Sequence, residues 1–145
     1  MSKNTDYPVT PAVRFLRTHQ IDFEPYIYVY EEHGGTGQFA QLFGVDEHQV
    51  VKTIVLQNEA KKGLVVVMHG DKQISTRNLA RDLGMKHIEP ADPKQANKWT
   101  GYLVGGTTPF GMKTRLPVYV EKSIWDLEKV YINGGMATYR CPALT

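Results

Sequence analysis

The sequence predicts an α+β fold in which helices flank a mixed, curved or barrel-like β-sheet. Strand-like and helix-like segments follow one another without the regular alternation of a doubly wound fold. Residues 64–68 (LVVVM) form an unbroken apolar run, which is typical of a strand buried on both faces. The length of 145 residues suits one compact domain, and we expect residues 1–145 to form it.

In the first half of the chain, turn and cap residues mark where elements begin and end. Pro11 follows Thr10, a good N-cap, and predicts a helix start, whereas Gly44 predicts a helix end. Aromatic and β-branched residues around Tyr28 favour a strand. The expected elements are a helix at 11–19, a strand at 24–30, a loop at 31–37, a short helix at 38–43, and strands at 50–56 and 64–68.

The second half shows the same kinds of signal. Ser75 is a candidate N-cap and Gly84 a helix stop. The apolar residues Tyr102–Val104 are interpreted as the end of a buried strand. The remaining expected elements are helices at 75–83 and 93–100, an extended piece at 86–88, a glycine loop up to Lys113, a strand at 117–121, a short helix at 123–127, a strand at 130–132, a loop at Asn133-Gly134-Gly135 and a terminal extended stretch.

Charge is unevenly distributed, although the net charge is only +2. Residues 1–60 carry 4 Lys/Arg against 8 Asp/Glu, whereas residues 61–115 carry 10 against 4. A basic middle third favours an anionic partner such as a nucleic acid, with a solvated lysine face as the alternative.

No apolar run is long enough to span a bilayer, and the N-terminal residues lack the apolar core of a signal peptide. The single cysteine, Cys141, excludes an internal disulfide and fits a reducing compartment. These features favour a cytoplasmic protein without a membrane partner.

The familiar cofactor and nucleophile motifs are absent. The 5 histidines show no metal-ligand spacing, and no P-loop, dinucleotide fingerprint or nucleophile elbow occurs. Nothing near Cys141 in the sequence marks its thiol as activated. We therefore expect no metal site and no cofactor.

What remains is a lysine within a strand, Lys52, and a stiff loop from Gly105 to Pro109. Glycine lets the backbone adopt positive φ or approach a ligand closely, and Pro109 restricts the residue before it. With the second glycine pair, Gly134-Gly135, these segments predict a cleft with one cation and free backbone N–H groups. Such a cleft suits a phosphate or a carbonyl oxygen. An ordinary turn is the alternative for the loop, and a solvent-facing side chain is the alternative for Lys52.

Three segments, VKT at 51–53, TGYLVGGTTPFGMK at 100–113 and YINGG at 131–135, resemble the YbaK/EbsC family of aminoacyl-tRNA deacylases. This family is related to the editing domain of bacterial prolyl-tRNA synthetases. The resemblance covers nearly the whole chain. It implies a barrel-like core flanked by helices, and hydrolysis of amino acids wrongly esterified to a tRNA 3′ end.

The resemblance also implies roles for individual residues. Lys52 would bind the phosphate of the terminal nucleotide, and the loop would position the ester through its backbone. Tyr30, or failing that Tyr28, would line the site. The implied catalytic residues are Lys52, Gly105 and Gly106; the implied substrate-binding residues are Tyr30, Thr107, Thr108, Pro109, Gly134 and Gly135; and the implied tRNA-binding residues are Lys113 and Arg115.

One departure concerns the segment after the second glycine pair. Residues 136–140 read MATYR, where YbaK-like members carry a basic pair, a glycine and a nearby carboxylate, and Arg140 would stand near the place of that carboxylate. Cysteinyl-tRNA for proline is the leading substrate, and another amino acid such as alanine stays open. A tRNA-end or small phosphate-binding module without turnover is the rival reading, and a synthetase is a possible partner.

Overall fold

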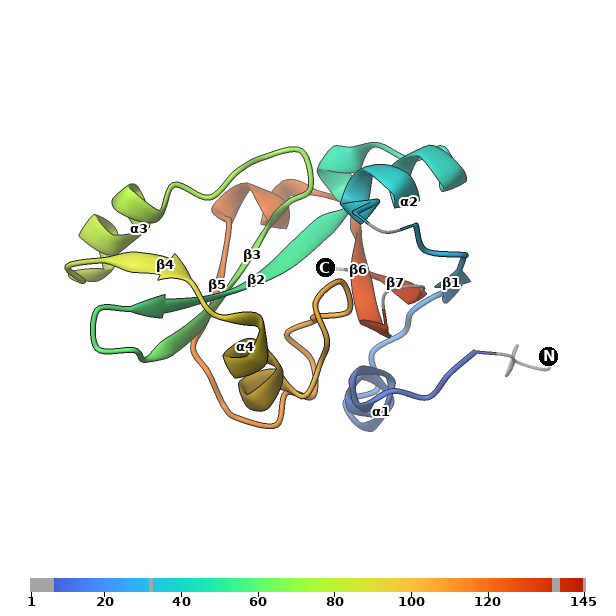
Figure 1. Ribbon diagram of the computed structural model, residues 1–145. Coiled ribbons are helices and arrows are strands. Elements are labelled where there is room, and N and C mark those ends of the chain that lie inside the picture. Colours follow the sequence, from blue (N-terminus) through green and yellow to red (C-terminus); the bar gives the residue numbers. More distant parts are fainter. Residues whose placement is uncertain (1–6, 32, 137–138, 145) are drawn as a thin grey trace.

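The computed structural model describes residues 7–31, 33–136 and, as backbone alone, 139–144. Figure 1 shows the course of the chain. The helices and strands are α1 (Pro11–Thr18), β1 (Tyr26–Ile27), α2 (Gly35–Phe43), the 3-10 helix η1 (Glu47–Gln49), β2 (Val51–Asn58), β3 (Gly63–His69), α3 (Thr76–Leu83), β4 (Ile88–Pro90), α4 (Pro93–Thr100), β5 (Val118–Val120), the 3-10 helix η2 (Lys122–Asp126), β6 (Lys129–Met136) and β7 (Tyr139–Leu144).

The strands form two sheets. The 4-stranded sheet has the order β4-β2-β3-β5, and the 3-stranded sheet has the order β1-β7-β6. β3 and β5 run parallel while β2 pairs antiparallel with both β3 and β4, so the larger sheet is mixed. A single parallel bridge between Val50 and Tyr131 brings β6 beside the start of β2. In the described residues neither sheet closes on itself, and the prediction of an α+β fold with a mixed, curved sheet is confirmed.

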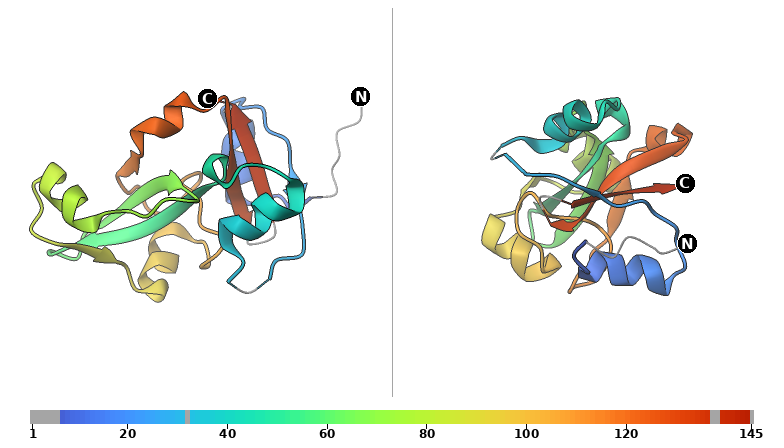
Figure 2. Two further views of the ribbon diagram at one scale, coloured as in Figure 1. Left: turned by 90° about the horizontal axis from the view of Figure 1, so that it is seen from above. Right: turned by 90° about the vertical axis from the view of Figure 1, so that its right-hand side faces the viewer.

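Apolar side chains fill the space between the sheets and beneath the helices. β6 packs on the larger sheet through Val130 and Ile132, which contact Val51 and Val67. On the other face, α3 covers the far end of the larger sheet, where Ala80 packs on Leu56, Leu64 and Val66. Figure 2 shows the two sheets crossing, with α3 and β4 far from β6 and β1.

The predicted helix caps are present. The Thr10 hydroxyl accepts a hydrogen bond from the Val13 N–H at 3.1 Å, and Ser75 accepts one from Asn78 at 3.2 Å. Gly44 and Gly84 end α2 and α3 in the left-handed conformation, where glycine carries no steric penalty. Local chemistry therefore determines where these helices begin and end.

Two predictions in the first third of the chain are wrong. The strand expected at 24–30 shrinks to Tyr26–Ile27, because β7 pairs with these two residues alone, and Val29 is 86% exposed. The loop expected at 31–37 contains the first turn of α2, which begins at Gly35. A hydrogen bond of 2.8 Å from the Thr36 hydroxyl to Glu47 holds this turn in place. A pattern of neighbouring residues does not predict this bond, because its partner lies beyond the helix.

Two predictions around the glycine segments are also wrong. Tyr102–Val104 is not a strand: Leu103 and Val104 are 74% and 72% exposed, because Gly101 turns the chain away from the sheet after α4. Asn133-Gly134-Gly135 is not a loop but lies within β6, where a register shift against β7 accommodates the glycines. The short elements expected at 86–88 and 123–127 are displaced to Ile88–Pro90 and Lys122–Asp126.

Candidate active site

A cavity of about 460 Å³ opens at the edge of β2, between the start of α2, the segment from β4 to α4, the glycine loop and β6. Its lining combines a few polar groups with apolar walls. The lining residues are Tyr30, Gly35, Thr36, Lys52, Thr53, Ile54, Val55, Pro90, Ala91, Pro93, Ala96, Val104, Gly105, Thr107 and Asn133. Among the described residues no serine, cysteine or histidine lines this cavity.

Lys52 is the cation of the cavity. Its Nζ donates one long hydrogen bond, 3.4 Å, to the Gly70 carbonyl oxygen. Within the described part of the chain no carboxylate forms an ion pair with Lys52. Because an ammonium group has three N–H donors, Lys52 keeps donors and an uncompensated charge for an anionic ligand.

The peptide unit between Gly105 and Gly106 is held at both ends. The buried Asn133 side chain donates to the Gly105 carbonyl oxygen at 2.6 Å, and the Gly106 N–H donates to the Leu103 carbonyl oxygen at 2.9 Å. Gly105 itself has a φ of 91°, a conformation that favours glycine. In the described residues no group accepts from the N–H of Gly105 or Thr107. Those two amides, rather than that of Gly106, are available to a ligand.

The rest of the loop is braced against α4 and α1. Asn97 donates to the Tyr102 carbonyl oxygen at 3.0 Å, and the Tyr102 hydroxyl donates to the Phe110 carbonyl oxygen at 2.5 Å. Burial raises the pKa of Tyr102 to about 12, so this hydroxyl stays protonated as a donor. Near the end of the loop, Gly111 has positive φ and lies where a Cβ would meet the Pro11 carbonyl at 2.6 Å.

The structure brings some of the sequence-predicted site residues together and separates others. Tyr30, Lys52, Gly105 and Thr107 all line the cavity. Gly106, Thr108 and Gly134 are buried behind it, and the Gly135 N–H donates to Asn133 at 2.8 Å. Pro109 instead lines a second, apolar cavity of about 360 Å³, behind the loop. Lys113 and Arg115 are exposed and do not line the first cavity.

Three contributors to the cavity are not among the residues that the sequence predicts. They are Asn133, the start of α2 at Gly35-Thr36, and the segment from Pro90 to Ala96. A polar residue directly before a glycine pair is a usable signal for Asn133. The other two segments have no local signal, because distant contacts place them at the cavity: the pairing of β2 with β4 for the segment from Pro90, and the hydrogen bond from Thr36 to Glu47 for the start of α2.

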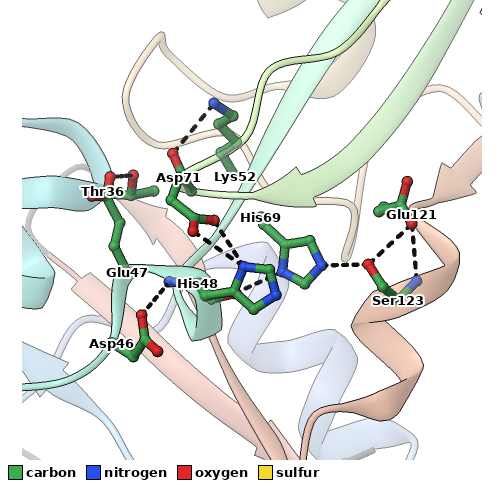
Figure 3. A network of polar contacts seen from close by, with 10 residues as sticks. Thr36, Asp46, Glu47, His48, Lys52, His69, Asp71, Glu121 and Ser123 are labelled. Atoms are coloured by element: carbon green, nitrogen blue, oxygen red, sulfur yellow. Dashed lines mark hydrogen bonds and ion pairs between the residues drawn. The ribbon is translucent and has the colours of Figure 1, made fainter.

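Beside the cavity, a polar network ties the end of β3 to both 3-10 helices (Figure 3). The rings of His48 and His69 stack with centroids 3.6 Å apart. His69 bonds the His48 carbonyl oxygen through Nδ1 and Ser123 through Nε2, both at 2.7 Å. The hydrogen bond from His48 lowers the pKa of Asp71, and the Ser123 N–H and hydroxyl lower that of Glu121. The network holds the turn at Gly70, whose carbonyl oxygen accepts the hydrogen bond from Lys52.

His48, His69 and Asp71 stand close enough to suggest a metal site, but their geometry does not fit one. The two rings are tilted by only 7°, so their nitrogen lone pairs run side by side instead of converging on one point. Both ring nitrogens of His69 also have other partners. The cluster is therefore best explained as a structural network.

Fold and cavity together define a class of protein: a small α+β protein whose cavity presents backbone amides and one lysine to a ligand. The chain belongs to the aminoacyl-tRNA editing domain family, whose model matches residues 33–142, and the resemblance to YbaK/EbsC proteins is thereby confirmed. It is an ester hydrolase of the aminoacyl-tRNA deacylase type that acts on tRNA.

Relatives include both free-standing proteins and parts of synthetases. EbsC of Enterococcus faecalis, named as a Cys-tRNA(Pro)/Cys-tRNA(Cys) deacylase, is 26% identical over 93% of this chain and 83% of its own length. A proline–tRNA ligase of Brachyspira hyodysenteriae is 27% identical over 65% of this chain but only 16% of the ligase. A solved structure described as a trans-editing enzyme for prolyl-tRNA synthetase has the same fold, with a TM-score of 0.79 at 22% identity over 92% of this chain and 84% of that one.

None of the helices in the described residues has the length and apolar character needed to cross a membrane.

The segment that departs from the YbaK-like pattern after the second glycine pair lies outside the described residues. Ala137 and Thr138 are not described, and neither are the side chains of Arg140 and Cys141, so this departure has no structural account.

Proposed function

We propose that the protein removes the amino acid from misacylated tRNA in trans, with cysteinyl-tRNA for proline as the leading substrate. The name of EbsC supports this substrate. We further propose that residues 1–145 form one editing domain, that it works in the cytoplasm, and that a synthetase supplies tRNA selectivity. The observation that carries the proposal is the cavity itself, which is lined by both Lys52 and Gly105, and the Gly105 carbonyl oxygen is held in place by Asn133.

The roles that we propose for Lys52 and for the loop amides follow from the hydrogen-bond donors that each has free. Lys52 binds the phosphate of the terminal nucleotide, since it has spare N–H donors and no ion-pair partner among the described residues. The amides of Gly105 and Thr107 bind the oxygen that becomes negatively charged when the ester is attacked. One such donor is worth about 10²–10³ in rate, and a donor held by the fold needs no reorganisation.

The attacking group is proposed to be water or, for a cysteinyl ester, the thiol of the substrate. No serine, cysteine or histidine among the described residues lines the cavity, so a side-chain nucleophile of these types has no place there. An aminoacyl ester is already activated, and orientation with oxyanion binding supplies the acceleration.

The remaining site residues have narrower proposed roles. Tyr30 and Thr107 contact the substrate from the cavity wall, while Thr108, Pro109, Gly134 and Gly135 shape the wall from behind. Lys113 and Arg115 bind the tRNA outside the cavity, since both are exposed.

A panel of tRNAs, each charged with one amino acid, tests the proposal. We expect deacylation of cysteinyl-tRNA for proline well above the spontaneous rate, and weaker or no cleavage of correctly charged prolyl-tRNA. Preferred cleavage of alanyl-tRNA would replace cysteine by alanine as the proposed amino acid and leave the proposed reaction unchanged. Binding of tRNA without cleavage of any ester would favour the module without turnover.

A further inference from the structure

The backbone of β2 has a gap in its hydrogen-bond ladder at the cavity. Along a strand, the N–H and C=O of successive residues point alternately to the two neighbouring strands. The Val55 carbonyl oxygen accepts from Ala91 at 3.0 Å, and Gln57 pairs with Glu89 of β4. The odd-numbered residues of β2 therefore point away from β3, toward the edge that β4 covers.

β4 covers only the far part of this edge. Its pairing begins at Leu56, and the Ala91 N–H extends it to Val55. At the other end, the bridge between Val50 and Tyr131 brings in β6. Between the two neighbours stands Thr53, whose N–H and C=O face the same edge.

Thr53 has no strand partner at that edge. Among the described residues Thr53 is paired only with Val67 of β3, on the opposite side, so no strand pairs with it at this edge, and Thr53 lines the cavity. Its hydroxyl is buried without a partner among the same residues, so it is the main chain that can meet a ligand. An unpaired donor and acceptor on one residue form a binding edge for one further residue of extended chain.

An aminoacyl ester carries the matching pair of groups. Its α-amino group donates, its carbonyl oxygen accepts, and both are attached to one α-carbon, as in a single strand residue. In a hydrogen-bonded antiparallel pair, two residues exchange both N–H···O bonds across Cα atoms about 5.5 Å apart.

We propose that the aminoacyl group binds Thr53 as a one-residue antiparallel strand. The Thr53 carbonyl oxygen accepts from the substrate's α-amino group, and the Thr53 N–H donates to the ester carbonyl oxygen, the same oxygen to which the amides of Gly105 and Thr107 are proposed to donate when the ester is attacked. This inference rests on the proposed function and adds the mode of amino-acid recognition to it.

The surroundings of Thr53 agree with this mode. Lys52, the proposed phosphate ligand, is its chain neighbour, and the Gly105 loop lines the same cavity. Main-chain recognition reads the amino and carbonyl groups that all aminoacyl esters share. Selection between amino acids then falls to the apolar wall, at residues such as Ile54, Ala96 and Val104.

An amide-linked probe tests the binding mode without turnover. The probe is 3′-amino-3′-deoxyadenosine acylated with cysteine, and its matched control carries 3-mercaptopropionyl, which lacks only the amino group. Titration is followed by the ¹H–¹⁵N resonance of Thr53. We expect this resonance to shift and saturate with the cysteinyl probe, and the control to bind about ten- to a hundredfold more weakly.

Two proline variants test the backbone directly. Thr53→Pro removes an N–H that the ladder does not use, a change that sheet edges tolerate, and Thr53→Val is its comparator with the N–H retained. Ile54→Pro removes an N–H that points to β3, and we expect it to destabilise the fold strongly. Thr53→Pro should stay folded and bind the cysteinyl probe at least about tenfold more weakly than Thr53→Val. If it does not fold, the resonance titration of the unaltered protein decides.

Several results would overturn the inference. They are a Thr53 resonance that does not respond at saturating probe, equal affinity for the two probes, failure of both probes to bind, or a folded Thr53→Pro variant that binds as tightly as Thr53→Val. Failure of the proposed function looks different. A responding Thr53 amide with no deacylation in the tRNA panel supports the binding mode and contradicts the enzyme, and the reverse pattern contradicts the binding mode alone.

Discussion

The side chain of Asn133 offers the sharpest test of how the glycine loop works. It is 4% exposed and makes two hydrogen bonds, donating to the Gly105 carbonyl oxygen at 2.6 Å and accepting from the Gly135 N–H at 2.8 Å. Asn133→Ala removes both bonds and leaves two backbone groups without their partner. Asn133→Asp keeps an acceptor for Gly135 but has no N–H for Gly105.

The magnitude follows from those bonds. A buried polar group left without its partner costs about 1–3 kcal/mol, and we expect Asn133→Ala to lower the free energy of unfolding by about that amount. Release of the Gly105–Gly106 peptide also misaligns the neighbouring amides. A loss of about 1.4–2.7 kcal/mol in transition-state binding corresponds to about a ten- to hundredfold fall in kcat/KM.

The assay is single-turnover deacylation beside thermal unfolding. Because the amides of Gly105 and Thr107 are proposed to act on the transition state, the loss should fall on kcat more than on KM. Gln57→Ala is the matched control, since it removes an amide hydrogen bond of 2.8 Å to Glu89 at the far end of β2. That control should lose some stability and keep kcat/KM within about twofold. If folded Asn133→Asp and Asn133→Ala both retain the unaltered kcat/KM, the reasoning is refuted.

Four further predictions concern the same cavity and its partner. Lys52→Ala should fold and lose about ten- to a hundredfold in deacylation, because a hydrogen bond to a charged group contributes about 1.5–3 kcal/mol; unchanged rates would remove Lys52 from the site. Gly105→Val should retain its circular dichroism and lose activity, since the position has a φ of 91° that a β-branched residue tolerates poorly, and an active variant would make Gly105 a turn residue only. Affinity for tRNA should fall with salt at a slope of about −0.7 per single-strand phosphate contacted, less steeply when Lys113 and Arg115 are both changed to Gln; a flat salt profile would favour a small-molecule ligand. Cys141→Ser should deacylate at near-normal single-turnover rates, and mass spectrometry should find no acyl adduct on the unaltered protein; a dead variant or an adduct on Cys141 would reveal a thiol nucleophile.

The two wrong predictions at the glycine segments share one physical cause. Tyr102–Val104 has the apolar character of a strand, yet Gly101 ends α4 in the left-handed conformation and no sheet edge is presented to the residues that follow. Asn133-Gly134-Gly135 has the composition of a turn, yet pairing of β6 with β7 on both sides of it keeps it in the sheet. In both cases the available partner strand overrides local propensity.

The sequence by itself determined the features that depend on neighbouring residues. Thr10 and Pro11 begin α1, Gly84 ends α3, and the apolar run at 64–68 becomes β3, one of the two inner strands of the larger sheet. Lys52 and the loop from Gly105 to Pro109 were also visible, because a lysine within a strand and a glycine-proline loop are local patterns. The resemblance of these segments to a known family predicts that they form one site.

Only the tertiary structure decided which groups of that site are free. The bond from Asn133 to Gly105 spans 28 residues, and the one from the Gly106 N–H to Leu103 removes a donor that the sequence left available. The unpaired edge at Thr53 exists because β4 and the residue after it reach only Val55, while the backbone bridge to β6 in the described residues lies at Val50, just before β2. Strand partners and their register are set by contacts between distant segments, and a pattern of neighbouring residues carries no record of them.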